Sequence, residues 1–241
     1  MNIIKKIFTK STGYWIHKLS SLPVGTDLYI DIHQRFGYGP LNAMFDVGAN
    51  IGQTYEWFRN NEPKAKIYCF EPVLAPFQQL KLLACSDKNC VLENIALGDT
   101  VGKKTIKVFD KYSYLNSLKD ELMNHDSNAK EEIINIDTLD NYCIKKEITK
   151  IDILKIDTEG YELNVIAGGR EMLNNAQVSF IFCEAGFLKS DRQHTNFQDL
   201  SEWLAARNYF FVGLYGLSLH AWKYNSYFGN ALFAHRGIYK Y

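Results

Sequence analysis

The sequence has no excess of charge of either sign. Its 241 residues include 27 lysines and arginines and 27 aspartates and glutamates, so the formal net charge is zero. Proteins that bind nucleic acids through electrostatics carry a strongly basic surface. We therefore expect no nucleic-acid partner. Hydrophobic residues make up 46% of the chain and charged residues 22%, which excludes a disordered chain and is typical of a domain with a full core.

Long hydrophobic runs are also missing. No segment reaches the roughly 18 apolar residues that a membrane span needs. The basic N-terminus, MNIIKKIFTK, is not followed by an apolar region of signal-peptide length. These absences predict a cytoplasmic protein without a transmembrane segment, and no feature of the sequence sets an oligomeric state.

The cysteines and histidines lack the spacings of common metal sites. The five cysteines form no C-x-x-C pair, and the six histidines form neither H-x-H nor H-E-x-x-H. The number of cysteines is odd, and Cys69 and Cys183 lie inside apolar runs, which favours reduced thiols over a disulfide framework. A metal site built on histidines therefore has little support from the sequence.

Short apolar runs alternate with helix-like segments from residue 43 onward. We expect strands at 43–49, 66–72, 90–97, 103–109, 150–157, 178–186, 209–216 and 231–237. We expect helices at 51–60, 74–84, 162–173 and 197–207. The alternation predicts an α/β fold with a mostly parallel sheet. The last two strands have no helix between them, so they should form a hairpin at one edge.

The stretch before the first strand has a different composition. Residues 1–42 contain three glycines between positions 25 and 39 and precede the first βαβ unit. We predict that they form an N-terminal extension, and that residues 43–241 form one domain.

A glycine-containing loop follows the first predicted strand. The segment FDVGANIGQT contains Gly48 and Gly52, which permit a tight turn and the close approach of a ligand. The helix that follows offers free N–H groups to an anionic group. The second predicted strand ends with Glu71, which can accept hydrogen bonds from both hydroxyls of a ribose. These features predict a site for a nucleoside cofactor.

The loop differs from the dinucleotide-binding pattern. That pattern is G-x-G-x-x-G, whereas this loop reads G-x-x-x-G with Asn50 between the glycines. Asp46, just before the loop, would repel a pyrophosphate but attract cationic groups. S-adenosylmethionine, with its sulfonium, amino group, carboxylate and ribose, fits these residues better than a nicotinamide dinucleotide. A nicotinamide-dependent oxidoreductase and a non-catalytic nucleoside-binding module remain as alternatives.

Four segments together resemble the FkbM family of S-adenosylmethionine-dependent methyltransferases. They are FDVGANIGQT, CFEP, ENIALGD and LKIDTEGYEL, and the resemblance extends from about Asp46 to Glu184. It implies the class I methyltransferase fold, a Rossmann-like seven-stranded sheet that is mostly parallel with an antiparallel last strand. It also implies O-methylation of a saccharide or glycosylated metabolite, and it places Asn94 and Ala96 beside the adenine.

Three acidic residues stand where the two most apolar strands end. Asp157 and Glu159 follow the strand at 150–157, and Glu184 lies near the end of the strand at 178–186. Neighbouring parallel strands place their carboxyl ends at one edge of the sheet, so these acids should converge beside the cofactor. We assign all three to catalysis as groups that orient an acceptor hydroxyl or remove its proton. His194, in the next loop, is a reserve candidate for the base.

Two other interpretations of these acids remain open. The three carboxylates could hold a divalent metal ion, because oxygen ligands suit Mg²⁺. Alternatively, Asp157 or Thr158 could cap the next helix, with Glu162 in its first turn. We assign no residue to a metal from the sequence.

Overall fold

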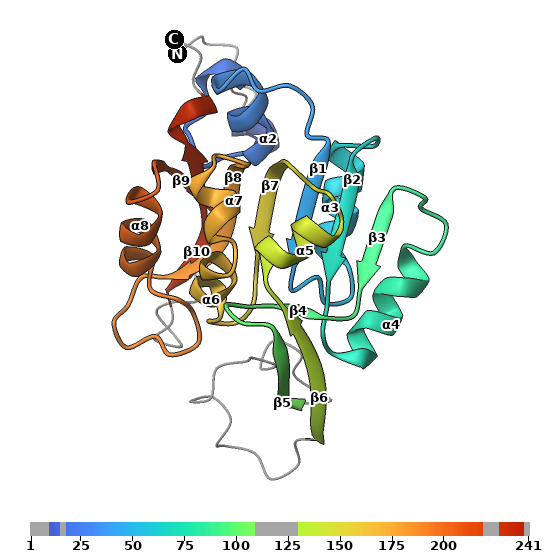
Figure 1. Cartoon of the computed structure of the whole chain (residues 1–241). Coiled ribbons are helices and arrows are strands. Elements are labelled where there is room, and N and C mark those ends of the chain that lie inside the picture. Colours follow the sequence, from blue (N-terminus) through green and yellow to red (C-terminus); the bar gives the residue numbers. More distant parts are fainter. Residues whose placement is uncertain (1–9, 15–17, 109–129, 219–226, 239–241) are drawn as a thin grey trace.

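A computed structural model describes residues 10–14, 18–108, 130–218 and 227–238, shown in Figure 1. Its centre is a seven-stranded sheet with the order β3-β2-β1-β7-β8-β10-β9. The strands are β1 (Ala43–Val47), β2 (Lys66–Phe70), β3 (Cys90–Glu93), β7 (Ile151–Ile156), β8 (Val178–Gly186), β9 (Tyr209–Tyr215) and β10 (Phe228–His235). All pairs are parallel except those of β10, which runs antiparallel to both β8 and β9. This confirms the predicted mostly parallel sheet with a hairpin at one edge.

Helices cover both faces of the sheet, which explains why the central strands are apolar on both sides. One face packs against α5 (Leu139–Lys145), α6 (Glu162–Ala167), α7 (Arg170–Asn174) and α8 (Phe197–Ala205). The other packs against α3 (Gln53–Asn61) and α4 (Leu74–Leu83). In Figure 1, α5, α6 and α7 lie in front of the sheet and α3 lies behind it. All six residues of β7 are buried between these two layers.

The helix predicted at 162–173 is two helices in the structure. α6 ends at Ala167 and α7 begins at Arg170, with Gly168 and Gly169 between them. A Cβ on Gly168 would lie 1.9 Å from the carbonyl oxygen of Gly98. The close approach of these two backbones therefore requires a glycine where the helix breaks.

The described part of the N-terminal extension shares the core of the main domain. It contains the short helices α2 (Leu28–Ile30) and η2 (Asp31–Arg35). Leu28, Ile32 and Leu41 are buried in the same cluster as the residues of α3 and α4. The Tyr215 hydroxyl of β9 donates to Asp31 Oδ2 at 2.6 Å. Phe36 packs against Phe180 of β8 and Phe210 of β9, so this segment covers the β8–β10–β9 part of the sheet beside α3.

A second, three-stranded sheet was only partly predicted. It has the order β4-β6-β5 and consists of β4 (Ala96–Leu97), β5 (Gly102–Val108) and β6 (Lys130–Asp137). The single strand predicted at 90–97 is divided between β3 of the large sheet and β4 of the small one. In Figure 1, the small sheet lies below the large sheet and projects away from it. Its Ile106, Ile134 and Ile136 form a separate small core.

Candidate active site

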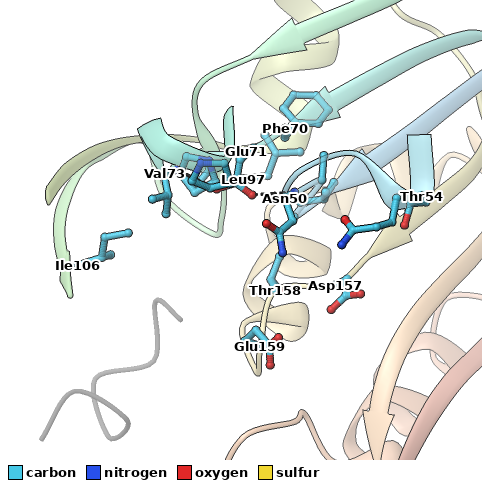
Figure 2. Close-up of a pocket in the computed structure, with 17 residues that line it drawn as sticks. Asn50, Thr54, Phe70, Glu71, Val73, Leu97, Ile106, Asp157, Thr158 and Glu159 are labelled. Carbon is cyan, nitrogen blue, oxygen red and sulfur yellow. Dashed lines mark hydrogen bonds between the residues drawn. The ribbon is translucent and has the colours of Figure 1, made fainter. Parts of the chain in front are cut away.

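A cavity of about 320 Å³ opens at the carboxyl ends of three strands. Its wall is formed by residues 47–50 at the end of β1, residues 70–73 at the end of β2 and residues 157–159 after β7. Gln53 and Thr54 of α3, Pro76 of α4, and Ala96, Leu97 and Ile106 of the small sheet complete it. Figure 2 shows Glu71 and Asn50 on one side, with Asp157 and Glu159 on the side away from Glu71.

The glycine loop is tightly packed against the end of β7. Gly48 has a φ of +82°, and a Cβ there would lie 1.8 Å from the carbonyl oxygen of Asp157. Gly52 has a φ of +105° and precedes α3, but a Cβ there would meet Leu83 of α4. Gly48 therefore contributes to the cavity wall, while Gly52, which is not part of the wall, allows α3 and α4 to pack.

Glu71 holds the turn between the first two strand ends. Its side chain is buried, with Oε2 accepting from the Asn50 N–H at 2.9 Å and Oε1 from the Val73 N–H at 2.8 Å. Burial raises the pKa of Glu71 to about 7, although these two hydrogen bonds oppose the shift. Each oxygen can accept a further hydrogen bond from the cavity side.

Asn94 and Ala96, predicted to lie beside an adenine, are placed differently from each other. Ala96 is part of the cavity wall. Asn94 is not part of the wall that the described residues form, and its Nδ2 donates to the carbonyls of Glu71 and Pro72 at 2.9 and 3.0 Å. Asn94 therefore supports the turn that carries Glu71.

Asp46 lies behind the cavity wall. It is fully buried on β1, and its carboxylate has no hydrogen-bond partner among the residues that the structure describes. Strand alternation explains this position, because Phe45 and Val47 pack on one face and Asp46 points to the other. Burial raises its pKa to about 7.

Lys155 is a site residue that the sequence interpretation missed. It pairs in register with Asp46, is 4% exposed, and lies 3.0 Å from Asp157 Oδ2 through its Nζ. Burial alone would lower the pKa of Lys155, but the neighbouring carboxylates, Asp157 first, raise it above its usual value. A lysine inside the otherwise apolar run ILKI was the available signal. Lys155 fixes the Asp157 carboxylate at the cavity wall.

Glu159 and Glu184 converge, as predicted for neighbouring strand ends. Glu159 forms part of the cavity wall, and Gln193 Nε2 donates to its Oε2 at 3.0 Å. Glu184 lies on β8 behind it, with its Oε2 3.5 Å from His194 Nε2. Burial, reinforced by Asp157, raises the pKa of Glu159 to about 7 and that of Glu184 to about 9.

The interpretation of Asp157 or Thr158 as a helix cap is wrong. α6 begins at Glu162, its N-cap residue is Tyr161, and no side chain in the described structure makes the capping hydrogen bond. The buried Glu162 carboxylate instead accepts from the Thr158 N–H, the Thr158 hydroxyl and the Gly160 N–H at 3.0–3.1 Å, and from the Thr195 hydroxyl. These bonds stabilise a turn in which Glu159 has a φ of +53°.

Replacing Glu162 with glutamine should therefore destabilise the protein. An amide leaves some of these buried donors without an acceptor, which costs about 2 kcal/mol. We expect the melting temperature to fall by roughly 4–8 °C, measured by circular dichroism. The matched control is Glu171→Gln, an exposed glutamate in the first turn of α7. Equal melting temperatures for the two variants would contradict this role.

None of the helices within the described ranges is long and apolar enough to cross a membrane.

Comparison with protein families gives a match over more than half of the chain. Residues 46–211 match the family profile described as "Methyltransferase FkbM domain". The 2-O-methyltransferase NoeI of Sinorhizobium fredii (strain NBRC 101917 / NGR234) is 28% identical over 159 residues. That alignment covers 60% of this chain and 63% of NoeI, less than two thirds of the relative.

Two solved structures illustrate the structural similarities. A Burkholderia thailandensis 1,6-didemethyltoxoflavin-N1-methyltransferase, with bound 1,6-didemethyltoxoflavin and S-adenosylhomocysteine, is 10% identical with a TM-score of 0.46. That similarity covers 85% of this chain and 74% of the other. M. capricolum TrmK, in complex with S-adenosylhomocysteine, is 14% identical with a TM-score of 0.43. That similarity covers 85% of this chain and 67% of TrmK. On the strength of the profile match over residues 46–211, the chain belongs to the FkbM methyltransferase family.

Proposed function

We propose that the protein is an S-adenosylmethionine-dependent O-methyltransferase that methylates a hydroxyl of a saccharide or glycosylated metabolite. The observation that carries this proposal is the cavity at three strand ends, with the buried carboxylate of Glu71 on one side and the acidic residues Asp157 and Glu159 on the other. A nucleoside cofactor and an acceptor hydroxyl would meet between them.

The residues of the cavity fit the chemical groups of S-adenosylmethionine. Glu71 has acceptor capacity for both ribose hydroxyls. The apolar side chains of Val73, Leu97 and Ile106 offer a surface for the adenine ring. The first N–H groups of α3, at Gln53 and Thr54 in the wall, have no partner within the helix and suit the carboxylate. Asn50 Oδ1 is buried without a partner in the described structure and can accept from the amino group.

The acidic side of the cavity suits the acceptor. When bound, the cofactor supplies an electrophilic methyl group attached to a sulfonium. Asp157, held by Lys155, can accept a hydrogen bond from the acceptor hydroxyl and receive its proton as the oxygen is methylated. Glu159 and Glu184, close behind, extend the acidic surface that orients the acceptor. The buried Lys155 keeps the Asp157 carboxylate in one position through the reaction.

Two observations favour an oxygen of a saccharide as the acceptor atom. The relative NoeI is by name a 2-O-methyltransferase. Beyond Glu184, the chain carries an aromatic pair, Phe187 and Tyr227, whose rings lie 5.5 Å apart, and Tyr227 is 37% exposed. Exposed aromatic rings can pack against the apolar face of a sugar while the tyrosine hydroxyl stays in water.

Incubation with methyl-labelled S-adenosylmethionine and a panel of saccharides tests the proposal. We expect label to enter a saccharide, and the position of the new methyl ether can be determined by NMR. Transfer only to amino groups or to ring nitrogens would contradict O-methylation. A parallel incubation with glycosylated and deglycosylated forms of the same metabolite would test the requirement for a sugar.

A further inference from the structure

Three potential metal ligands from different segments converge next to the cavity, where Glu159 forms part of its wall. They are Glu159 in the loop after β7, Glu184 on β8, and His194 in the loop after β8. One ligand atom from each lies within 4.8 Å of the others. The three side chains approach one point although 35 positions separate Glu159 from His194 in the numbering.

The histidine is oriented as metal ligands usually are. Its Nδ1 lies 2.9 Å from Asp191 Oδ2, and the same carboxylate, through Oδ1, accepts from the Gln193 and His194 N–H groups. The imidazole stacks on Phe228 at a centroid distance of 4.1 Å and is 5% exposed. A carboxylate on one ring nitrogen fixes the tautomer and directs the other nitrogen, Nε2, toward Glu184.

The carboxylates of the cluster are oriented and crowded. Gln193, next to the histidine, donates to Glu159, so the loop of residues 191–194 supports two members of the cluster. The side chain of Glu184 is 12% exposed. One carboxylate oxygen of Glu159 lies within 4.8 Å of one of Glu184, and two carboxylates at that separation repel each other when both are ionised. A cation between them would remove that repulsion.

We propose that Glu159, Glu184 and His194 form a binding site for a divalent transition-metal ion. One imidazole nitrogen with two carboxylate oxygens suits ions from Mn²⁺ to Zn²⁺ better than Mg²⁺ or Ca²⁺, which prefer oxygen ligands alone. Three protein ligands leave coordination positions open, as in catalytic metal sites. This set differs from the three carboxylates considered from the sequence, because His194 takes the place of Asp157.

The position of the site indicates its use. Glu159 belongs to the wall of the cavity, so open coordination positions would face the acceptor side. A metal ion there can bind the acceptor hydroxyl and lower its pKa, which makes the oxygen a better nucleophile. This use depends on the proposed methyl transfer, whereas metal binding itself does not.

Titration of the full-length protein with Co²⁺ tests the site directly. After treatment with a chelator and dialysis, we expect one Co²⁺ per chain with visible absorption bands, displaced by Zn²⁺ but not by Mg²⁺. His194→Ala and Glu184→Gln should each weaken Co²⁺ binding at least about 10-fold, and Asp191→Asn should weaken it by about 10- to 100-fold.

The matched control is His33→Ala. His33 also pairs with a glutamate, Glu62 at 2.8 Å, but lies in η2 among residues that do not form the cavity wall. Its loss should leave Co²⁺ binding unchanged. Failure of the wild-type protein to bind Co²⁺, or equal affinity in wild type and Asp191→Asn or His194→Ala proteins of unchanged circular dichroism, would overturn the proposal and favour a metal-free acid–base pair.

The two proposals fail in different ways. Metal binding at these residues without any methylation of a hydroxyl would contradict the proposed function and leave the metal site intact. Methylation at an unchanged rate in chelator, together with no Co²⁺ binding, would remove the metal site and leave the proposed function intact.

Discussion

Replacing Glu71 with alanine should weaken the binding of S-adenosylmethionine at least about 100-fold. Hydrogen bonds to a charged group contribute about 1.5–3 kcal/mol each, and Glu71 has room for two ribose hydroxyls. Losing both hydrogen bonds reduces the binding free energy by about 3 kcal/mol or more. Each loss of about 1.4 kcal/mol weakens the affinity tenfold. The alanine also frees the Asn50 and Val73 N–H groups that Glu71 now holds. Isothermal titration calorimetry with S-adenosylhomocysteine measures the effect.

Two further variants separate binding from folding in that experiment. Glu71→Gln keeps the size of the side chain but removes the charge and one acceptor oxygen, so it should lose most of the same affinity. Glu202→Ala, which changes an exposed glutamate on α8, should bind the cofactor as the wild type does.

The pKa of the Glu71 carboxyl, about 7, allows a pH test of the same role. Because this carboxylate is ionised above pH 7, the affinity for the cofactor should fall as the pH drops below 7. A folded Glu71→Ala protein with nearly normal affinity would contradict this role.

Replacing Asp157 with asparagine should reduce turnover by at least about 100-fold and leave cofactor affinity largely unchanged. A positioned proton acceptor contributes about 10²–10⁴ to the rate. The amide keeps the shape of the side chain but cannot accept the proton of the hydroxyl. It also removes the partner of the buried Lys155, which lies 3.0 Å away. Steady-state rates at saturating cofactor and calorimetry on the same samples give the two quantities.

The control for this variant is Asp199→Asn, an exposed aspartate in the first turn of α8. It should retain both turnover and affinity. Equal losses of turnover and cofactor affinity in Asp157→Asn would contradict the division of roles between the two sides of the cavity. Full activity in Asp157→Asn would show that another group receives the proton.

The large sheet was predictable because its signals are local. Runs such as VSFIFC, and ILKI apart from Lys155, are apolar on both faces, as expected of strands covered on both sides. Gly48 directly follows the first strand, β1. The small sheet was predictable only at β5, because β6 begins with the charged residues Lys130, Glu131 and Glu132 and pairs with the two-residue β4, more than 30 positions earlier. A strand of two residues is too short to show a periodic pattern, and the sequence of β6 does not indicate a partner so far away.

The site was predictable where strand ends determine it. Glu71, Asp157 and Glu159 lie in the cavity wall because parallel strands share one carboxyl edge. The partners of these residues were harder to find. Lys155 reaches Asp157 from inside β7, and Asn94 turns toward the backbone of Glu71 instead of the cavity. Side-chain direction at a strand end depends on packing that the order of residues does not contain.

The contacts made by the loop after β8 were not predictable from any pattern in the sequence. His194 meets Glu184 and Asp191 only because residues 187–196 fold back over the end of β8, where Gly186 pairs with Asn196. Asp191 and His194 are three positions apart, a spacing that is common in loops without any function. The backbone fold, rather than the spacing, brings these groups together.

Calorimetric titration of the wild-type protein with S-adenosylmethionine is the most direct test of the proposed cofactor. We expect one binding site per chain, saturated at micromolar to sub-millimolar concentrations as is usual for enzyme ligands, with S-adenosylhomocysteine competing and NADH not competing. Absence of S-adenosylmethionine binding, or its displacement by NADH, would contradict S-adenosylmethionine as the cofactor.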